Sequence, residues 1–337
     1  MSFLKHLWPV LKWGMFLVVL LFVARHGYLL WVDDRWTAVD SRAADIHWGW
    51  LALAGGSSVV AWLPSVWYWR KLMLATGATP RWPQVFRSYY CGHLGKYVPG
   101  KAAAIVIRTA LLKDSGVAAS AAAFTATVEA VTYMWTGTLL AVLLYSSLAA
   151  YLPETIAAPL GNPLLRLVLV GLIVCLGLGG LIALTRSYER LVKMLGGQPP
   201  AARLAPRSAP ARAIFSGVLV FLAAWWIQGL TLGLTMQAVS HDRIAWSEWP
   251  CWTATAAVAM VGGFIAIFTP GGLGVREGLL MELLTGQVGA HQAVLVAVLM
   301  RGVSLAGEIL IAATLYYAVS GIPVNAGTLL VPPRRGS

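Results

Sequence analysis

Residues 163–185 read PLLRLVLVGLIVCLGLGGLIALT, and this stretch decides the class of fold. Arg166 is its only charged residue. A helix needs about 20 mostly apolar residues to cross the hydrocarbon core of a bilayer. The stretch is long enough and apolar enough for one crossing, so it predicts a transmembrane helix.

The composition of the whole chain supports the same class. Of its 337 residues, 58% are hydrophobic and only 11% are charged, whereas a soluble domain carries about 25% charged residues. These values exclude an ordinary soluble enzyme. The net charge is +12, but the basic residues cluster between apolar segments. Membrane topology explains that pattern, so we expect no nucleic-acid partner.

The sequence predicts an all-α polytopic membrane protein with six transmembrane helices, at about 9–32, 47–69, 116–148, 163–185, 213–239 and 290–320. The first span resembles a signal sequence, but no small-residue cleavage site follows it, so we expect it to remain uncleaved. Two further apolar segments, near 84–112 and 251–286, are interrupted by Pro and Gly.

The loops between these spans alternate in charge. Lys and Arg gather in 70–87 and 186–212, whereas 33–46, 151–162 and 240–250 are acidic or nearly uncharged. Positive loops mark the cytoplasmic side of a membrane protein. The counts predict a multi-pass protein of the cell (inner) membrane with both termini in the cytoplasm.

Tryptophan is abundant, with 16 residues, and many of them fall at predicted span ends. Amphipathic aromatic rings favour the membrane interface, so we expect an interfacial belt; a stacking platform for sugars or bases is the alternative. The belt would include Trp8, Trp31, Trp48, Trp50, Trp67, Trp69, Trp246 and Trp249.

The two interrupted segments resemble each other. Each has an aromatic residue two positions before a Pro-Gly pair, and aligning Pro99 with Pro270 also aligns Val117 with Val288. This predicts an internal repeat within a single membrane domain, 1–337. Its halves are expected at about 47–185 and 213–320, joined by a Pro- and Arg-rich cytoplasmic linker at 186–212.

Three full spans separate the two Pro-Gly pairs, and an odd number of crossings inverts the second unit. The sequence therefore predicts two oppositely oriented re-entrant helical hairpins that meet near the bilayer midplane, as in inverted-repeat transporters. Broken backbone at that depth is tolerated only inside protein or beside water. The N–H groups of each restarting helix would attract an anion.

Nine ionisable residues lie in or beside these segments: Lys96, Lys101, Arg108, Glu129, Arg276, Glu277, Glu282, Arg301 and Glu308. Each costs about 2.5–3.5 kcal/mol at mid-bilayer unless it pairs or meets water. One interpretation is a phosphate-binding cavity lined by the cations Lys96, Lys101, Arg108 and Arg276. The other is structural pairing, such as Glu129 with Arg301 or Arg276 with Glu308; both can hold together.

The backbone-breaking residues complete the candidate substrate-binding set. The set includes all of these charged residues except Glu282. It also includes Tyr97, Pro99, Gly100, Pro270, Gly271, Gly272 and Gly274. Residues 95–102 nearly match a nucleotide-binding P-loop, but Ala102 replaces the Ser or Thr that binds Mg²⁺, and no strand precedes it. We therefore expect no nucleotide cofactor. The three Cys and six His residues show no metal-ligand spacing, and no catalytic triad or carboxylate pair stands out.

These motifs resemble the lysylphosphatidylglycerol synthase transmembrane (flippase-like) family over nearly the whole chain. The resemblance is carried by Tyr97-Val98-Pro99-Gly100-Lys101, Arg108, Glu129, Thr269-Pro270-Gly271-Gly272-Leu273-Gly274-Val275-Arg276-Glu277 and Arg301. It implies two re-entrant hairpins and a role in moving lipids across the bilayer. Two positions depart from the common pattern: Lys101 follows the less common Pro-Gly-Lys form, and Ala130 stands where many relatives have Arg. The resemblance therefore does not specify which lipid is the substrate.

The sequence thus predicts a lipid flippase or transporter, not an enzyme, with an anionic phospho- or polyprenyl-phosphate lipid as substrate. Residues 321–337 hold no aminoacyltransferase domain, so lipid aminoacylation is not expected. Two alternatives remain open: a membrane-embedded enzyme or glycosyltransferase accessory that uses Glu277, and a non-transporting assembly factor. A second copy of the chain or a lipid-modifying or glycosyltransferase enzyme is a candidate partner.

Overall fold

The computed structural model describes residues 46–97, 102–152, 154–187, 209–240, 244–266 and 269–319, together with positions 21, 25 and 190. In this part of the chain the regular structure is helical throughout, and no strand occurs. The expected all-α class is confirmed.

Five membrane-crossing candidates are long and apolar enough to span a bilayer. They match five of the six predicted spans, and the sixth, 9–32, lies outside the described residues except for positions 21 and 25. The second predicted span runs further than expected, to Ala75, because a new helix begins at Leu63 with Pro64 in its first turn, where a proline is tolerated. The five are α2 (Trp48–Val60) continued by α3 (Leu63–Ala75), α6 (Ala119–Leu143), α9 (Pro163–Arg186), α11 (Ala209–Val239) and α14 (Ala290–Val319).

Each interrupted segment forms two helices that pack against each other. In the first hairpin, α4 (Trp82–His93) and the 3-10 turn η2 (Leu94–Tyr97) lead to α5 (Ala102–Leu111). In the second hairpin, α12 (Trp249–Ile265) and the turn η6 (Pro270–Gly272) lead to α13 (Val275–Val288). The predicted break residues Pro99, Gly100 and Lys101 lie outside the described residues.

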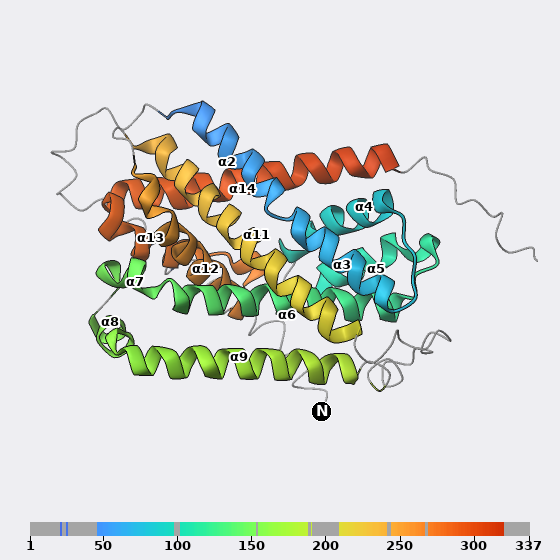
Figure 1. Ribbon diagram of the computed structural model, residues 1–337. Helices are drawn as coiled ribbons and strands as arrows, with labels where there is room; N and C mark the ends of the chain where they lie inside the picture. The colour runs from blue at the N-terminus through green and yellow to red at the C-terminus, as the bar shows by residue number, and fades with distance from the viewer. Residues whose placement is uncertain are drawn as a thin grey trace, which may run out of the picture.

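The helix ends gather at two ends of the molecule. At end one, where α3 ends and α4 begins, Lys71 on α3 donates to Ser216 on α11 at 2.7 Å, and Arg87 on α4 lies over the ring of Tyr316 on α14. At end two, where α2 begins and α11 ends, the N–H of His47 bonds the carbonyl of Ala238 at 2.9 Å. Figure 1 shows α4 and α5 at end one (right) and α13 at end two (left).

The tips of the two hairpins meet between these ends. Turn η2 packs on η6, and both turns approach Arg301 and Glu308 in the middle third of α14. Since α14 is about 45 Å long at 1.5 Å per residue, the tips lie well away from either end of the bundle. The turns of the two hairpins are therefore in contact with each other.

The packing partners correspond between the halves. The first arms of the hairpins contact opposite spans: α4 packs on α14, and α12 packs on α6. The second arms do the reverse: α5 packs on α6, and α13 packs on α14. In the same way, α3 packs on α6 and α11 packs on α14. Helix α2 packs along α11 between the halves.

Aromatic side chains fill the core beside the hairpins. Tyr133 on α6 stacks on Trp225 of α11 at 4.5 Å between ring centroids, and Phe221 meets both Tyr68 and Tyr133 edge-on. Trp69 was predicted at the interface, and this was wrong: it is fully buried, and its indole N–H donates to Thr125 at 3.1 Å. A buried indole needs such an acceptor, which the small polar face of α6 supplies.

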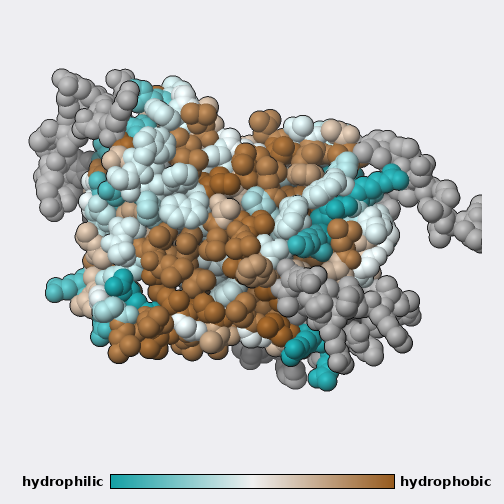
Figure 2. All heavy atoms as spheres, in the orientation of Figure 1, coloured by the Kyte–Doolittle hydropathy of each residue, from teal (hydrophilic) through white to brown (hydrophobic). Residues whose placement is uncertain are grey.

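The surface is apolar between the two ends. Figure 2 shows hydrophobic side chains over the middle of one face and hydrophilic ones toward its ends. Helix α9 is almost wholly exposed and rests on α6 where Trp135 fills the space left by Gly177. The remaining short helices are η3 (Lys113–Ser115), α7 (Tyr145–Leu148), η4 (Ala149–Tyr151), α8 (Glu154–Gly161) and η5 (Trp246–Glu248).

Candidate functional site

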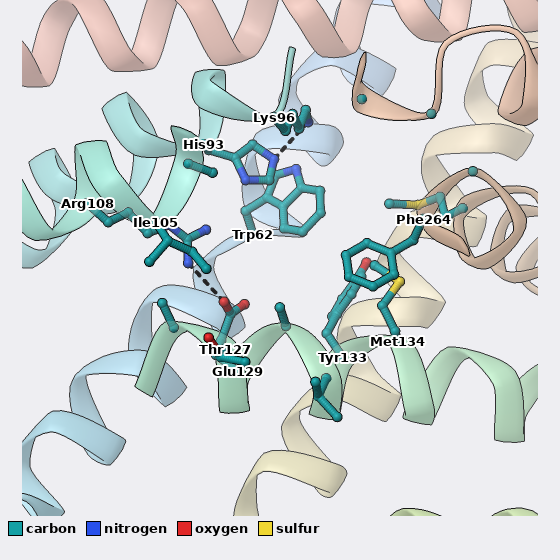
Figure 3. Close-up of a pocket in the computed structure, with 18 of the residues that line it drawn as sticks. Trp62, His93, Lys96, Ile105, Arg108, Thr127, Glu129, Tyr133, Met134 and Phe264 are labelled. Carbon is teal, nitrogen blue, oxygen red and sulfur yellow. Dashed lines mark hydrogen bonds and ion pairs between the residues drawn. The ribbon is translucent and has the colours of Figure 1, made fainter. Parts of the chain in front are cut away.

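A cavity of about 270 Å³ lies between the hairpin tips, α5 and α6. Most of its wall is apolar, and three cations from the described part of the chain reach it: Lys96 from the first hairpin's turn, Arg108 from α5 and Arg276 from α13. Figure 3 shows Lys96, His93 and Trp62 on one side and Arg108 with Glu129 on another. Few, precisely placed polar groups in an apolar pocket are typical of a ligand site.

Arg108 is committed to an ion pair. Its Nη1 donates to Glu129 Oε2 on α6 at 2.9 Å, and its guanidinium lies 4.0 Å from the ring centroid of Tyr89. Both charged side chains are buried. Gly92 makes room for the stem of Arg108, because a Cβ there would lie 2.3 Å from its Cγ. The pair ties both arms of the first hairpin to α6.

Lys96 is also held in an ion pair. Its ammonium group pairs with Glu308 Oε1 on α14, and His93 Nε2 lies 2.8 Å from Lys96 Nζ and 3.4 Å from the same carboxylate oxygen. The hydroxyl of Tyr97 donates to Glu308 Oε2 at 2.9 Å. The tip of the first hairpin therefore contacts both carboxylate oxygens of Glu308.

Glu277 supports the tip of the second hairpin. Its Oε2 accepts the N–H of Gly274 at 2.8 Å, and its Oε1 lies 3.3 Å from Arg301 Nη1 on α14. Arg301 also donates to the carbonyl of Gly271 at 3.2 Å and covers the ring of Tyr97. The start of α13 thus has its own carboxylate, and the expected exogenous anion is not needed at that N–H.

Arg276 differs from these three cations. It is 9% exposed and reaches the cavity wall, yet within the described part of the chain it makes no hydrogen bond or ion pair. Glu277, Arg301 and Glu308 act on it only at longer range. A buried charge without a partner is costly unless a ligand or water compensates it. Of the three described cations that line the cavity, Arg276 is therefore the one whose charge is not already paired with a carboxylate.

The specific pairings offered from the sequence were wrong. Glu129 pairs with Arg108 instead of Arg301, and Glu308 pairs with Lys96 instead of Arg276. The reason is that the first hairpin contacts two spanning helices, α6 through Arg108 and α14 through Lys96, and residue spacing along the chain does not reveal these contacts. The general expectation of ion pairing in this region is nevertheless met.

Most of the predicted residues are brought together. Lys96, Tyr97, Arg108, Glu129, Gly271, Gly272, Gly274, Arg276, Glu277, Arg301 and Glu308 all lie in the cavity wall or in the contact network behind it. Pro270 opens turn η6, beside the cavity residues Gly271 and Gly272. Glu282 does not line the cavity. Pro99, Gly100 and Lys101 lie outside the described residues.

Three aromatic or imidazole side chains of the cavity were not among the predicted site residues. Trp62, Tyr89 and His93 line the cavity, and Trp62 packs on His93 at 4.2 Å between ring centroids. The signal available was the spacing of Tyr89 and His93 on α4, four residues apart and thus on one helix face. Among the described residues, no group of three or more His, Cys, Asp or Glu could hold a metal ion.

The model of one protein family, described as lysylphosphatidylglycerol synthase TM region, matches residues 12–328. The chain belongs to this family. The match covers both hairpins and all five spanning segments, so the cavity lies wholly within the family's membrane region. Membership supports a multi-pass membrane protein with a lipid-related role. No curated protein matches the chain.

Proposed function

We propose that the chain is a lipid flippase or transporter that moves a lipid with an anionic, phosphate-type headgroup across the cytoplasmic membrane. The single observation that carries the proposal is Arg276, which is buried at the cavity wall with no ion-pair partner among the described residues. Phosphate oxygens suit a guanidinium because its N–H groups can donate in pairs. Family membership and the apolar cavity wall support the same substrate class.

The architecture supports movement of the headgroup instead of static binding. We propose that the two hairpins re-enter the membrane from opposite sides and that the halves form an inverted repeat. The exchanged packing partners and the contact between η2 and η6 support this reading. In such transporters one repeat rocks against the other and exposes a central site alternately to each side. The membrane potential could bias the direction, by about 2.3 kcal/mol per charge per 100 mV.

The charges at the two ends support an orientation. Arg70, Lys71, Arg81 and Arg87 all lie near end one. Positive residues mark the cytoplasmic side. We therefore propose that end one faces the cytoplasm, so that the first hairpin enters from there and the second from outside.

The proposal contains no chemical step. Glu277 is the carboxylate that a membrane-embedded enzyme would use, but it already accepts the N–H of Gly274 and pairs with Arg301. A general base needs access to a substrate proton. These contacts favour a structural role for Glu277.

The test is reconstitution into phosphatidylcholine vesicles that contain a labelled anionic phospholipid. Transfer between leaflets is followed by quenching of the label from outside. We expect Arg276→Gln to slow transfer by about tenfold or more, with partial recovery in Arg276→Lys. Arg87→Gln is the matched control, because Arg87 lies over Tyr316 outside the cavity.

Three outcomes would overturn the proposal. Wild-type protein that fails to move any anionic lipid would remove the transport function. Arg276→Gln that transfers lipid as fast as wild type would remove the binding role of this residue. A product lipid of altered mass would show that the chain is an enzyme.

A further inference from the structure

Among the described residues that line the cavity, the exposed ones gather over the middle of α6. Three of its lining residues are exposed: Thr127 and Val131 on α6 and Phe264 at the end of α12. Phe264 and Val131 are 38% and 40% exposed, while Tyr89 and Arg108 at the inner wall are buried. The same space is therefore open to the surroundings at one side and closed by charged groups at the other.

The opening is a slot between α5 and the end of α12. Both helices pack on α6, but within the described residues they make no extensive contact with each other. The floor of the slot is formed by five residues of α6: Ala126, Thr127, Ala130, Val131 and Met134. Ile105 of α5 forms one wall, and Met260 with Phe264 forms the other.

The floor of the slot follows a helical periodicity. Ala126, Ala130 and Met134 repeat every four residues, and Thr127 and Val131 lie beside them, so all five share one face of α6. Two of the five are alanines, whose small side chains leave space above this face of the helix. The hydroxyl of Thr127 donates to the carbonyl of Ala123 at 3.0 Å, which satisfies it within the helix. The slot therefore presents an apolar surface.

The slot lies at mid-height in the bundle. Its floor occupies the middle of α6 (Ala119–Leu143), and its far wall is the tip of the second hairpin. Water is excluded from the hydrocarbon core of a bilayer, so an apolar opening at this height meets lipid tails. A polar solute would have no route through it.

We infer that this slot holds the hydrocarbon tail of the transported lipid while its headgroup occupies the cavity at Arg276. The inference rests on the proposed function and deepens it, because it names the path of the tail. Continuity of one cavity from the exposed Phe264 to the buried Arg276 is the reason for this choice of occupant.

The test uses a photoreactive lipid. Protein in phosphatidylcholine vesicles is illuminated with a phosphatidylglycerol that carries a diazirine in one acyl chain, and the labelled peptides are mapped. We expect labels on residues 126–134 and 260–264. Filling the floor with Ala130→Phe is expected to lower this labelling, and the transfer rate, by about tenfold.

Two further variants keep the test decisive. Thr127→Phe fills the slot from an exposed position, where the added ring has room if Ala130→Phe fails to fold. Ala313→Phe is the matched control: this alanine is exposed on α14 and does not line the cavity. We expect Ala313→Phe to leave labelling and transfer unchanged.

The outcomes separate this inference from the proposed function. Labelling elsewhere, or labelling that both slot-filling variants leave intact while Arg276→Gln stops transfer, overturns the tail path but leaves the transport proposal standing. Labelling and transfer that are absent in the wild type overturn both. Loss of labelling in both slot-filling variants but not in Ala313→Phe supports the tail path.

Discussion

The two hairpins have the same architecture but use their charges differently. In the first, Lys96 and Arg108 are each paired with a carboxylate on a spanning helix, Glu308 on α14 and Glu129 on α6. In the second, Glu277 caps its own helix and meets Arg301, while Arg276 is left without a partner among the described residues. The first hairpin is therefore anchored by its cations, whereas the second leaves one of its described cations unpaired at the cavity wall.

The largest expected effect is the loss of the first hairpin's anchor. Glu129→Ala leaves the buried guanidinium of Arg108 without its partner, so we expect the free energy of unfolding to fall by about 3–5 kcal/mol. Denaturant titration in mixed micelles measures it. The double variant Arg108→Met/Glu129→Met should recover most of the loss, because no unpaired charge remains. A loss below about 1 kcal/mol in the single variant would show that this pair does not anchor the hairpin.

A somewhat smaller effect is expected at the turn of the second hairpin. Gly272 has φ of +72°, and a Cβ there would lie 2.9 Å from the Cα of Gly263 on α12. Gly272→Ala combines left-handed backbone strain with overpacking against backbone, so we expect a loss of about 2–4 kcal/mol. Thermal unfolding in detergent measures it, with Gly302→Ala on the exposed face of α14 as control. Equal stability of the two variants would mean that the turn adjusts without cost.

The cap of α13 is expected to contribute less. Glu277→Ala removes the acceptor of the Gly274 N–H and the partner of Arg301, and we expect a loss of about 1–2 kcal/mol. Glu277→Gln keeps an acceptor oxygen, so it should retain part of this stability in the same unfolding assay. If the two variants lose the same amount, the ion pair with Arg301 matters and the cap does not.

The smallest effect on stability is expected at Arg276. Because it has no partner among the described residues, Arg276→Met should change the free energy of unfolding by less than about 1 kcal/mol, and a gain is compatible with the removal of a buried charge. Denaturant titration beside Glu129→Ala tests the comparison directly. A loss as large as that of Glu129→Ala would show that Arg276 is a structural residue like Arg108, and the contrast between the hairpins would fail.

Sequence patterns predicted the helices better than their contacts. Five spans and both interruptions could be located because apolar length and Pro-Gly pairs are local properties. Trp69 was misassigned to the interface because its position near a span end says nothing about which face of α3 it occupies. The contact of His93 with Glu308 joins α4 to α14, which are far apart in the chain, so it leaves no local signal in the sequence.

The sequence by itself determined that this protein is a helical membrane protein, that two segments are broken, and that ionisable residues concentrate at the breaks. Those properties depend on composition and spacing, and the high cost of charge in lipid gives them meaning. Only the tertiary structure decided which cations are paired, which of the described cations faces the cavity unpaired, and where the cavity opens. Pairing depends on distances of a few ångströms between helices far apart in the chain, and residue order does not specify these distances.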